Sequence, residues 1–226
     1  MGLKSEILEQ PQVLRHLLES QADHIREAAA FIRRHEVDYV FLAARGTSDN
    51  AGLYLKYLWG AHNGLPVAPA APSLFTMYGQ PPRLGRALVA GISQSGQSPD
   101  IVAVLHEGRR QGAPAIAITN DPTSPLAQNA DVVLDIQAGE EKAVAATKTY
   151  TAQLLTIAML SAALAEDEAA WEALAALPGF VEQAIEQDGA IARAAERYTF
   201  MPQCVVLGRG YNYATAVEWA LKLKEL

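Results

Sequence analysis

Residues 87–98, Ala-Leu-Val-Ala-Gly-Ile-Ser-Gln-Ser-Gly-Gln-Ser, decide the fold of this chain. The first six are apolar, and a run of that length is typical of a strand buried on both faces of a sheet. The last six form a polar loop, Ser93 to Ser98, and residues 100–110 behind it are predicted to be a helix. A buried strand, a polar turn and a helix in this order favour a parallel sheet with crossover helices.

The loop from Ser93 to Ser98 is a candidate anion site, because free N–H groups and the positive end of the helix dipole meet at a helix start. It holds three hydroxyls and no Lys or Arg. Such a loop suits a small sugar phosphate better than nucleic acid, whose binding needs many cationic contacts. A serine-rich turn that only caps the helix fits the loop equally well.

The residues around this unit repeat the alternation of strand and helix. Strands are expected at 39–44, 65–70, 87–92, 113–119 and 131–136. Helices are expected as a pair within 6–35, then at 47–61, 100–110, 124–127 and 146–165. This order predicts an α/β fold, a three-layer αβα sandwich around a parallel sheet. Polar clusters at Thr47-Ser48, Ser93–Ser98 and Thr119-Asn120 all follow strands, where such sheets bind ligands.

The order of the predicted elements changes after Glu166. Helices are expected at 168–177 and 180–197, separated by Pro178-Gly179, then a strand at 204–207 and a helix at 213–226. This order repeats the opening of residues 6–61. We therefore predict a first domain at 1–166 with a helical N-terminal arm, and at 167–226 the incomplete start of a second copy. Its apolar residues need cover that a single strand cannot give: Val205, Leu207, Leu221 and Leu223.

Composition limits the classes of partner and function that the chain can have. The 226 residues carry a net charge of −7, and 50% are hydrophobic, which supports a sizeable core and argues against nucleic-acid or anionic-membrane partners. The single cysteine, Cys204, is expected to be buried in its apolar run and fits a reducing compartment. No signal peptide or membrane span is evident, so we expect a cytoplasmic protein. The five histidines are scattered, so no metal site is expected.

Six motifs in order resemble the sugar isomerase (SIS) domain family, and specifically tandem-SIS proteins related to the isomerase half of glutamine–fructose-6-phosphate amidotransferase. The motifs are Glu6–Pro11, Ala44–Ser48, Ser93–Gly96, Ala145–Lys148, Leu207–Gly210 and Glu218–Glu225. The resemblance covers essentially the whole chain. It implies an SIS fold with a flavodoxin-like sheet, a sugar-phosphate ligand, no metal or organic cofactor, and a homodimer.

The resemblance also implies binding residues. The phosphate would be held by Ser93, Gln94, Ser95 and Ser98, with Thr47 and Ser48 near it and the open-chain sugar. Val144, Ala145 and Ala146 would line the sugar with main-chain atoms.

The final helix carries the implied catalytic residues. Glu225 matches the carboxylate that moves a proton between C1 and C2, and Lys222 matches a lysine near that site. Together with Glu218 they are spaced i, i+4, i+7, on one helix face. A base must reach the carbon acid that it deprotonates, and a lysine can stabilise an enediolate oxygen. Without the resemblance, this pattern favours an ordinary salt-bridged, solvent-facing helix over a catalytic one.

Three departures separate this chain from the amidotransferases. Gly2 stands where they carry a cysteine nucleophile, so we expect no use of glutamine. Trp219 replaces their usual glycine, and Gly139–Lys142 replaces their G-P-E-I; with Arg45 and Asp49-Asn50, these features resemble the stand-alone glucosamine-6-phosphate deaminases. The chain also ends one residue after Glu225, so the family's later lysine and histidine have no counterpart in it.

The resulting hypothesis is an enzyme of amino-sugar phosphate metabolism that isomerises and deaminates glucosamine 6-phosphate to fructose 6-phosphate. A fructosamine-phosphate cleaving enzyme is a related alternative. A non-catalytic sugar-phosphate binding module belongs to a different class, and an inactive truncated relative of the aminotransferase is the third possibility.

Overall fold

The computed structural model describes residues 2–226, so Met1 of the predicted first domain lies outside the described residues. A five-stranded parallel sheet forms the centre, in the order β2-β1-β3-β4-β5. The strands are β1 Tyr39–Ala44, β2 Val67–Pro69, β3 Ala87–Ile92, β4 Ala115–Thr119 and β5 Val132–Asp135. This is the flavodoxin-like strand order that the family resemblance implies.

The helices occupy the connections and the two ends of the chain. They are α1 Leu3–Ser20, α2 Ala22–Arg34, α3 Thr47–His62, α4 Ser73–Thr76, α5 Pro99–Arg110, α6 Pro125–Gln128, α7 Lys148–Ala165, α8 Glu168–Leu174, α9 Leu177–Ile185, α10 Asp188–Ala195 and α11 Tyr211–Glu225, with a 3₁₀ turn at Glu196–Tyr198. The predicted strands at 39–44 and 87–92 are confirmed to the residue, and the other predicted elements up to α7 within two or three residues; the short helix α4 was not predicted.

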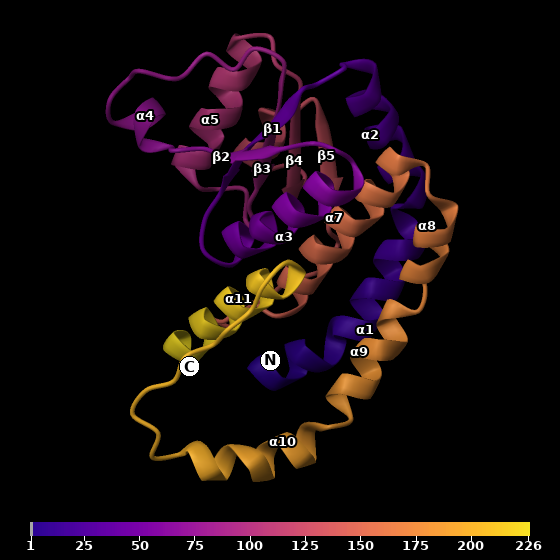
Figure 1. Ribbon diagram of the computed structural model, residues 1–226, viewed down its shortest axis with the longest axis vertical. Helices are drawn as coiled ribbons and strands as arrows, with labels where there is room; N and C mark the ends of the chain where they lie inside the picture. Colours follow the sequence, from indigo (N-terminus) through magenta and orange to yellow (C-terminus); the bar gives the residue numbers. More distant parts are fainter. Residues whose placement is uncertain (1) are drawn as a thin grey trace.

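Helices cover both faces of the sheet, which confirms the three-layer α/β sandwich (Figure 1). Alternate strand residues supply two apolar cores, because successive side chains point to opposite faces. Val40 and Leu42 of β1 pack into the core shared with α1, α2, α3 and α7. Phe41 and Ala43 pack into the smaller core shared with α5 and α6.

Beyond α7 the chain forms an arc of short helices, and α9 packs along α1 (Figure 1). The prediction that Pro178-Gly179 separates two helices is wrong. Both residues lie in the first turn of α9, where a proline has no hydrogen bond to lose. The breaks fall instead between Leu174 and Leu177, before α9, and between Ile185 and Asp188, after it.

The predicted strand at 204–207 does not form, and the predicted burial of Cys204 is wrong. Residues 201–209 are irregular and run beside α11 (Figure 1), and Cys204 is exposed. The side chains of Val205 and Leu207 are 82% and 87% exposed. The segment has strand composition, but a strand needs a hydrogen-bonded neighbour, and within residues 2–226 none lies beside it.

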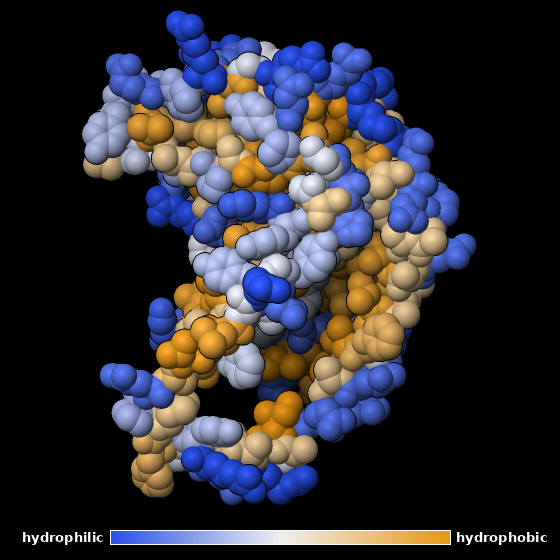
Figure 2. Space-filling model, in the orientation of Figure 1, coloured by the Kyte–Doolittle hydropathy of each residue, from blue (hydrophilic) through white to orange (hydrophobic). Residues whose placement is uncertain are grey.

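Apolar side chains remain uncovered on the inner side of the arc (Figure 2). A groove between α1 and the α9–α10 pair is lined by Ile7, Leu8, Phe180, Val181 and Ile191. The expectation that a partner, such as a second copy of the chain, covers this face stays a prediction. None of the helices in residues 2–226 has the length and apolar character needed to cross a bilayer.

Two glycines give a matched test of the packing. We expect Gly91→Ala in β3 to destabilise the protein by about 1–3 kcal/mol through overpacking. Its new Cβ would lie 2.6 Å from Leu105 Cδ1 and 2.9 Å from Leu126 Cδ1. Gly60→Ala in α3 meets nothing within 4 Å and should stabilise the helix by about 0.5–1 kcal/mol. Urea unfolding of both variants measures the difference, and equal stabilities would contradict the packing described above.

Candidate functional site

The loop from Ser93 to Ser98 is held in place by the end of β4 and the segment that follows it. The Ser93 N–H donates to the Ile118 carbonyl at 3.1 Å, and the Asn120 N–H donates to the Gln94 carbonyl at 3.0 Å. Gly96 has φ +61°, and a Cβ there would collide with the Ser124 side chain. Gly96 is therefore required both by its backbone angle and by the close approach of Ser124.

The serine hydroxyls of this loop accept local hydrogen bonds but keep their own donors. Ser93 Oγ accepts from the Gly96 N–H at 3.2 Å, and Ser95 Oγ accepts from the Gln97 N–H at 3.3 Å. Ser98 is the N-cap of α5, yet its side chain makes no capping bond. Within residues 2–226 none of the three hydroxyls donates to a protein acceptor, so a bound anion can receive these donors.

One cation lies beside the loop. Arg45, in the turn between β1 and α3, forms an ion pair with Asp100 in the first turn of α5. The Arg45 side chain is 67% exposed, whereas that of Asp100 is 16% exposed. The carboxylate neutralises most of the charge that the arginine brings, so hydroxyls, amides and the helix dipole remain the main anion donors of the loop.

A buried carboxylate joins α11 to α3. Glu218 is 5% exposed. Its two oxygens accept from Thr47 Oγ1 at 3.0 Å and from Asn50 Nδ2 at 2.7 Å. Lys222 Nζ lies 3.1 Å from the Glu218 carboxylate. A buried charge is tolerated when it is paired and hydrogen-bonded, and Glu218 has both an ion-pair partner and hydrogen-bond donors.

Lys222 connects this cluster to Glu225. Its ammonium donates to Thr47 Oγ1 at 3.1 Å and to Glu225 Oε2 at 2.7 Å. Partial burial acts to lower the pKa of Lys222, but the hydrogen bonds to Glu225 and Glu218 outweigh it and hold that pKa above its ordinary value. Lys222 is therefore a cation at neutral pH, suited to stabilising negative charge rather than to accepting a proton.

The polar cluster continues into α7. Ser48 Oγ accepts from Gln153 Nε2 at 3.1 Å, while Gln153 Oε1 and the Tyr150 hydroxyl are buried without a partner in the described chain. Burial raises the pKa of Tyr150 above its ordinary value, and the charge of Glu218 adds to the effect. Tyr150 thus stays protonated at physiological pH and is a buried donor near Glu218.

A third segment, residues 138–147, lies beside the loop through Asn120. The Asn120 side chain accepts from the Ala138 N–H at 2.8 Å and donates to the Gly139 carbonyl at 2.7 Å, while its main chain bonds Gln94. At the far end of this segment Val144 is 88% exposed, and Ala145 is buried. Asn120 therefore links the serine loop to the segment that contains residues 144–146.

The predicted site residues form two groups. Thr47, Glu218, Lys222 and Glu225 meet in one hydrogen-bonded cluster. Ser93, Gln94, Ser95 and Ser98 form the loop at the end of β3. Within residues 2–226 the side chain of Thr47 bonds to α11 rather than to this loop, and Ser48 bonds to α7. The two groups share one edge of the sheet, because β1 and β3 are parallel neighbours.

Several residues that organise the site have no role among the sequence-based expectations: Glu6, Asn50, Glu141, Lys148 and Tyr150. A signal existed for Glu6, because it lies on the same helix face as Leu14 and Leu17. A carboxylate on an apolar face indicates a buried partner. Glu141 gave no comparable signal, since its partners come from a loop, whereas Asn120 was expected at the site from its position after a strand.

No three His, Cys, Asp or Glu side chains converge in a way that could hold a metal ion in the part of the chain that the structure describes.

A family model described as "SIS domain" matches residues 35–163. The chain belongs to the SIS domain family. The isomerizing glutamine–fructose-6-phosphate aminotransferase of a Thermus thermophilus strain is 36% identical over 98% of this chain and 38% of its own length. Two solved structures each align over 98% of this chain. The one from Silicibacter pomeroyi DSS-3, provisionally described as a phosphosugar isomerase, is 40% identical with a TM-score of 0.92 over 67% of its length.

The other solved structure is the C-terminal domain of the Francisella tularensis glucosamine-fructose-6-phosphate aminotransferase, 29% identical with a TM-score of 0.88 over 66% of its length. These matches confirm the predicted relation to the isomerase half of the aminotransferases and the SIS fold. The SIS chain described here spans 38% of the length of the Thermus relative and about two thirds of the solved structures.

The Glu218 contacts predict how α11 is held. We expect Glu218→Ala to loosen α11 by about 1–3 kcal/mol, because the buried Asn50 amide and Lys222 lose a charged acceptor. Hydrogen exchange should accelerate in α11 and leave β3 and β4 unchanged. Lys224→Ala, an exposed site on the same helix, is the control. Unchanged exchange in α11 of the Glu218 variant would contradict this anchoring.

Proposed function

We propose that this SIS chain binds glucosamine 6-phosphate and belongs to a protein that converts it, with water, to fructose 6-phosphate and ammonia. The reaction joins an aldose–ketose proton transfer between C1 and C2 to loss of the amino group from C2. The leaving nitrogen departs as ammonia, and water supplies the oxygen of the new ketone. No oxidant or reductant is needed.

The observation that carries this proposal is the hydrogen bond from Lys222 to Thr47. Thr47 begins α3 directly after β1 ends, and Lys222 Nζ lies 3.1 Å from its hydroxyl. The Lys222–Glu225 pair is thereby tied to the carboxyl edge of β1, next to β3, which ends in the serine loop. Ligands of doubly wound sheets bind at this edge.

The two groups divide the chemistry. The serine loop would take the phosphate with hydroxyls, main-chain amides and the dipole of α5. Glu225, 28% exposed at the end of α11, would remove the proton from one carbon and return it to the other. Lys222 would stabilise the negative oxygen of the enediol-type intermediate. The main chain of residues 144–146 would line the sugar.

A non-catalytic sugar-phosphate binding module is the second candidate. The serine loop connects β3 to α5 and is hydrogen-bonded to β4 and the segment after it, none of which belongs to α11. Glu225, by contrast, lies on the last turn of α11. Binding could therefore exist without turnover. Parallel assays with glucosamine 6-phosphate and a fructosamine 6-phosphate distinguish deamination from the related cleavage reaction.

Ser95 tests the phosphate loop. We expect Ser95→Ala to weaken binding of glucosamine 6-phosphate by about 1–3 kcal/mol, because a hydrogen bond to a charged group is lost. Isothermal titration calorimetry measures the change, with Ser20→Ala on α1 as an exposed serine control. Unchanged affinity in the Ser95 variant would remove this hydroxyl from the site.

Glu225 tests the enzyme hypothesis. We expect Glu225→Gln to lower kcat by about 10²–10⁴-fold with little change in binding, because the amide cannot accept the proton. Coupled assays of ammonia and fructose 6-phosphate measure turnover, and wild-type turnover in D₂O should place deuterium at C1 of the product.

Glu172→Gln, an exposed change on α8, is the matched control. Binding of glucosamine 6-phosphate by the wild type without any turnover would favour the binding module. Turnover that survives in Glu225→Gln would show that another group is the base.

A further inference from the structure

Glu141 caps helix α7 from outside the helix. α7 begins at Lys148, and its N-cap residue Thr147 makes no side-chain capping bond. Glu141 supplies the acceptor instead: its Oε1 lies 2.9 Å from the Thr147 N and 3.3 Å from the Thr149 N, and its Oε2 accepts from the Thr149 hydroxyl. A carboxylate there satisfies free helix N–H groups and complements the dipole. These bonds close residues 141–147 into a tight loop.

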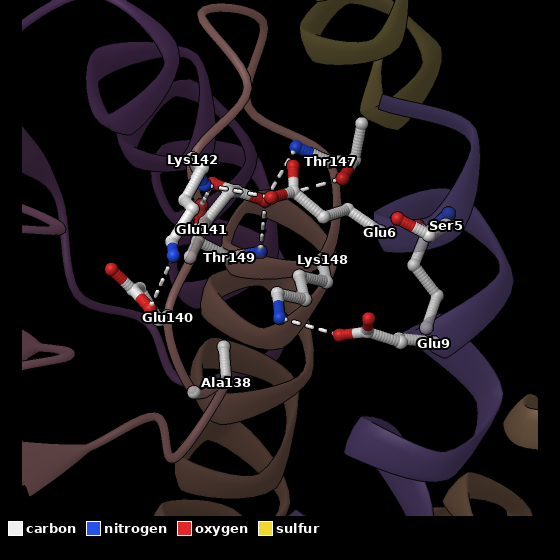
Figure 3. A network of polar contacts seen from close by, with 12 residues as sticks. Ser5, Glu6, Glu9, Ala138, Glu140, Glu141, Lys142, Thr147, Lys148 and Thr149 are labelled. Atoms are coloured by element: carbon white, nitrogen blue, oxygen red, sulfur yellow. Dashed lines mark hydrogen bonds and ion pairs between the residues drawn. The ribbon is translucent and has the colours of Figure 1, made fainter. Parts of the chain in front are cut away.

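Glu6 of α1 holds the same loop from its other side. The carboxylate is fully buried. It accepts from the Lys142 N–H at 2.7 Å (Figure 3), and it also accepts from the Ala143 N–H at 3.2 Å. Burial of a carboxylate is costly unless its oxygens are hydrogen-bonded. Two consecutive main-chain donors meet that need and fix the loop immediately before Val144.

An ion pair with a buried lysine secures α1 in this position. Lys148 Nζ lies 2.6 Å from Glu9 Oε2, and the lysine side chain is only 4% exposed (Figure 3). Glu9 lies nearly one turn after Glu6 on α1, and Lys148 is the first residue of α7. The pair therefore sets the distance between the helix that carries Glu6 and the helix that Glu141 caps.

The segment between the two carboxylates keeps its main chain free. Within residues 2–226 no hydrogen bond uses a main-chain group of Val144, Ala145 or Ala146. Unpaired main-chain groups in an ordered loop are rare unless water or a ligand satisfies them. The loop is thus fixed at both ends while its tip can offer N–H and C=O groups to a ligand.

We infer that Glu6 and Glu141 are positioning residues, which hold the main chain of Val144–Ala146 in the shape that receives the sugar. This role rests on the proposed function, since it assigns the sugar to this segment and the phosphate to the serine loop. It makes the N-terminal helix α1 part of the apparatus that selects the sugar, although neither carboxylate touches the ligand.

The test compares a ligand that needs the segment with one that does not. Glu6→Gln keeps the side-chain size but turns an N–H group of the new amide toward a main-chain N–H. We expect about 10- to 100-fold weaker binding of glucosamine 6-phosphate, the cost of losing one hydrogen bond to a charged group. Binding of inorganic phosphate, which the serine loop takes alone, should change less than about twofold, as for a site remote from the change.

Hydrogen exchange gives a readout that is independent of ligand. The amides of Lys142 and Ala143 should exchange faster in Glu6→Gln, and those of β3 should not. Glu19→Gln, exposed on the same helix, is the matched control. Should Glu6→Gln fail to fold, Glu141→Gln tests the same loop from its other end, with the amides of Thr147 and Thr149 as the reporters.

The outcomes separate the two proposals. A wild-type chain that binds neither ligand overturns the proposed function and this role with it. A wild type that binds both, with a folded variant that binds both equally well, overturns the positioning role alone. Equal losses for sugar phosphate and inorganic phosphate also overturn it, because the carboxylates would then support the fold rather than select the sugar.

Discussion

Parallel pairing of the five strands is the constraint on which the rest of the structure depends. Because all strands run in one direction, every strand ends at the same edge, and every following loop begins there. The serine loop after β3, the start of α3 after β1, and Asn120 after β4 meet at this edge for that reason. Residues that are far apart in sequence thus become neighbours without any long-range side-chain contact.

Side chains then decide which outlying helix reaches the edge. Helix α11 follows an irregular segment and is separated from the sheet in sequence, yet Glu218 buries its charge against Thr47 and Asn50 of α3. The same principle appears at the other end of the chain, where Glu6 fastens α1 to the loop before α7. In both places a carboxylate finds donors that would otherwise be unsatisfied, so polar contacts add to the apolar packing that joins the two ends of the chain to the rest of the fold.

Sequence patterns predicted the fold well where a single physical rule dominates. The runs Tyr39–Ala44 and Ala87–Ile92 are buried on both faces, and this burial leaves few alternatives to a central strand. The start of α6 was equally predictable, since Ser124 caps it and Pro125 occupies its first turn. For the site, helical spacing placed Glu218, Lys222 and Glu225 together, and their mutual hydrogen bonds follow from that spacing alone.

The parts that sequence did not predict depend on a partner distant in the chain. Whether residues 204–207 become a strand depends on a neighbouring strand, and composition cannot supply one. The roles of Glu141 and Asn120 depend on loop shapes that follow from tertiary packing. Asn50 was visible as a polar residue near the start of α3, but nothing in its own surroundings indicated that a carboxylate from position 218 would meet it.

The irregular segment at 201–209 has a consequence for the chain in solution. Its apolar residues Val205 and Leu207 face water beside the exposed thiol of Cys204, and Val205 has a strong strand preference. An unpaired apolar segment of this kind can pair with another molecule, and an accessible thiol can make such a contact covalent under oxidising conditions. Encounter between two such segments is a second-order process, so its rate rises with the square of protein concentration, whereas the intramolecular fold around the sheet is independent of concentration.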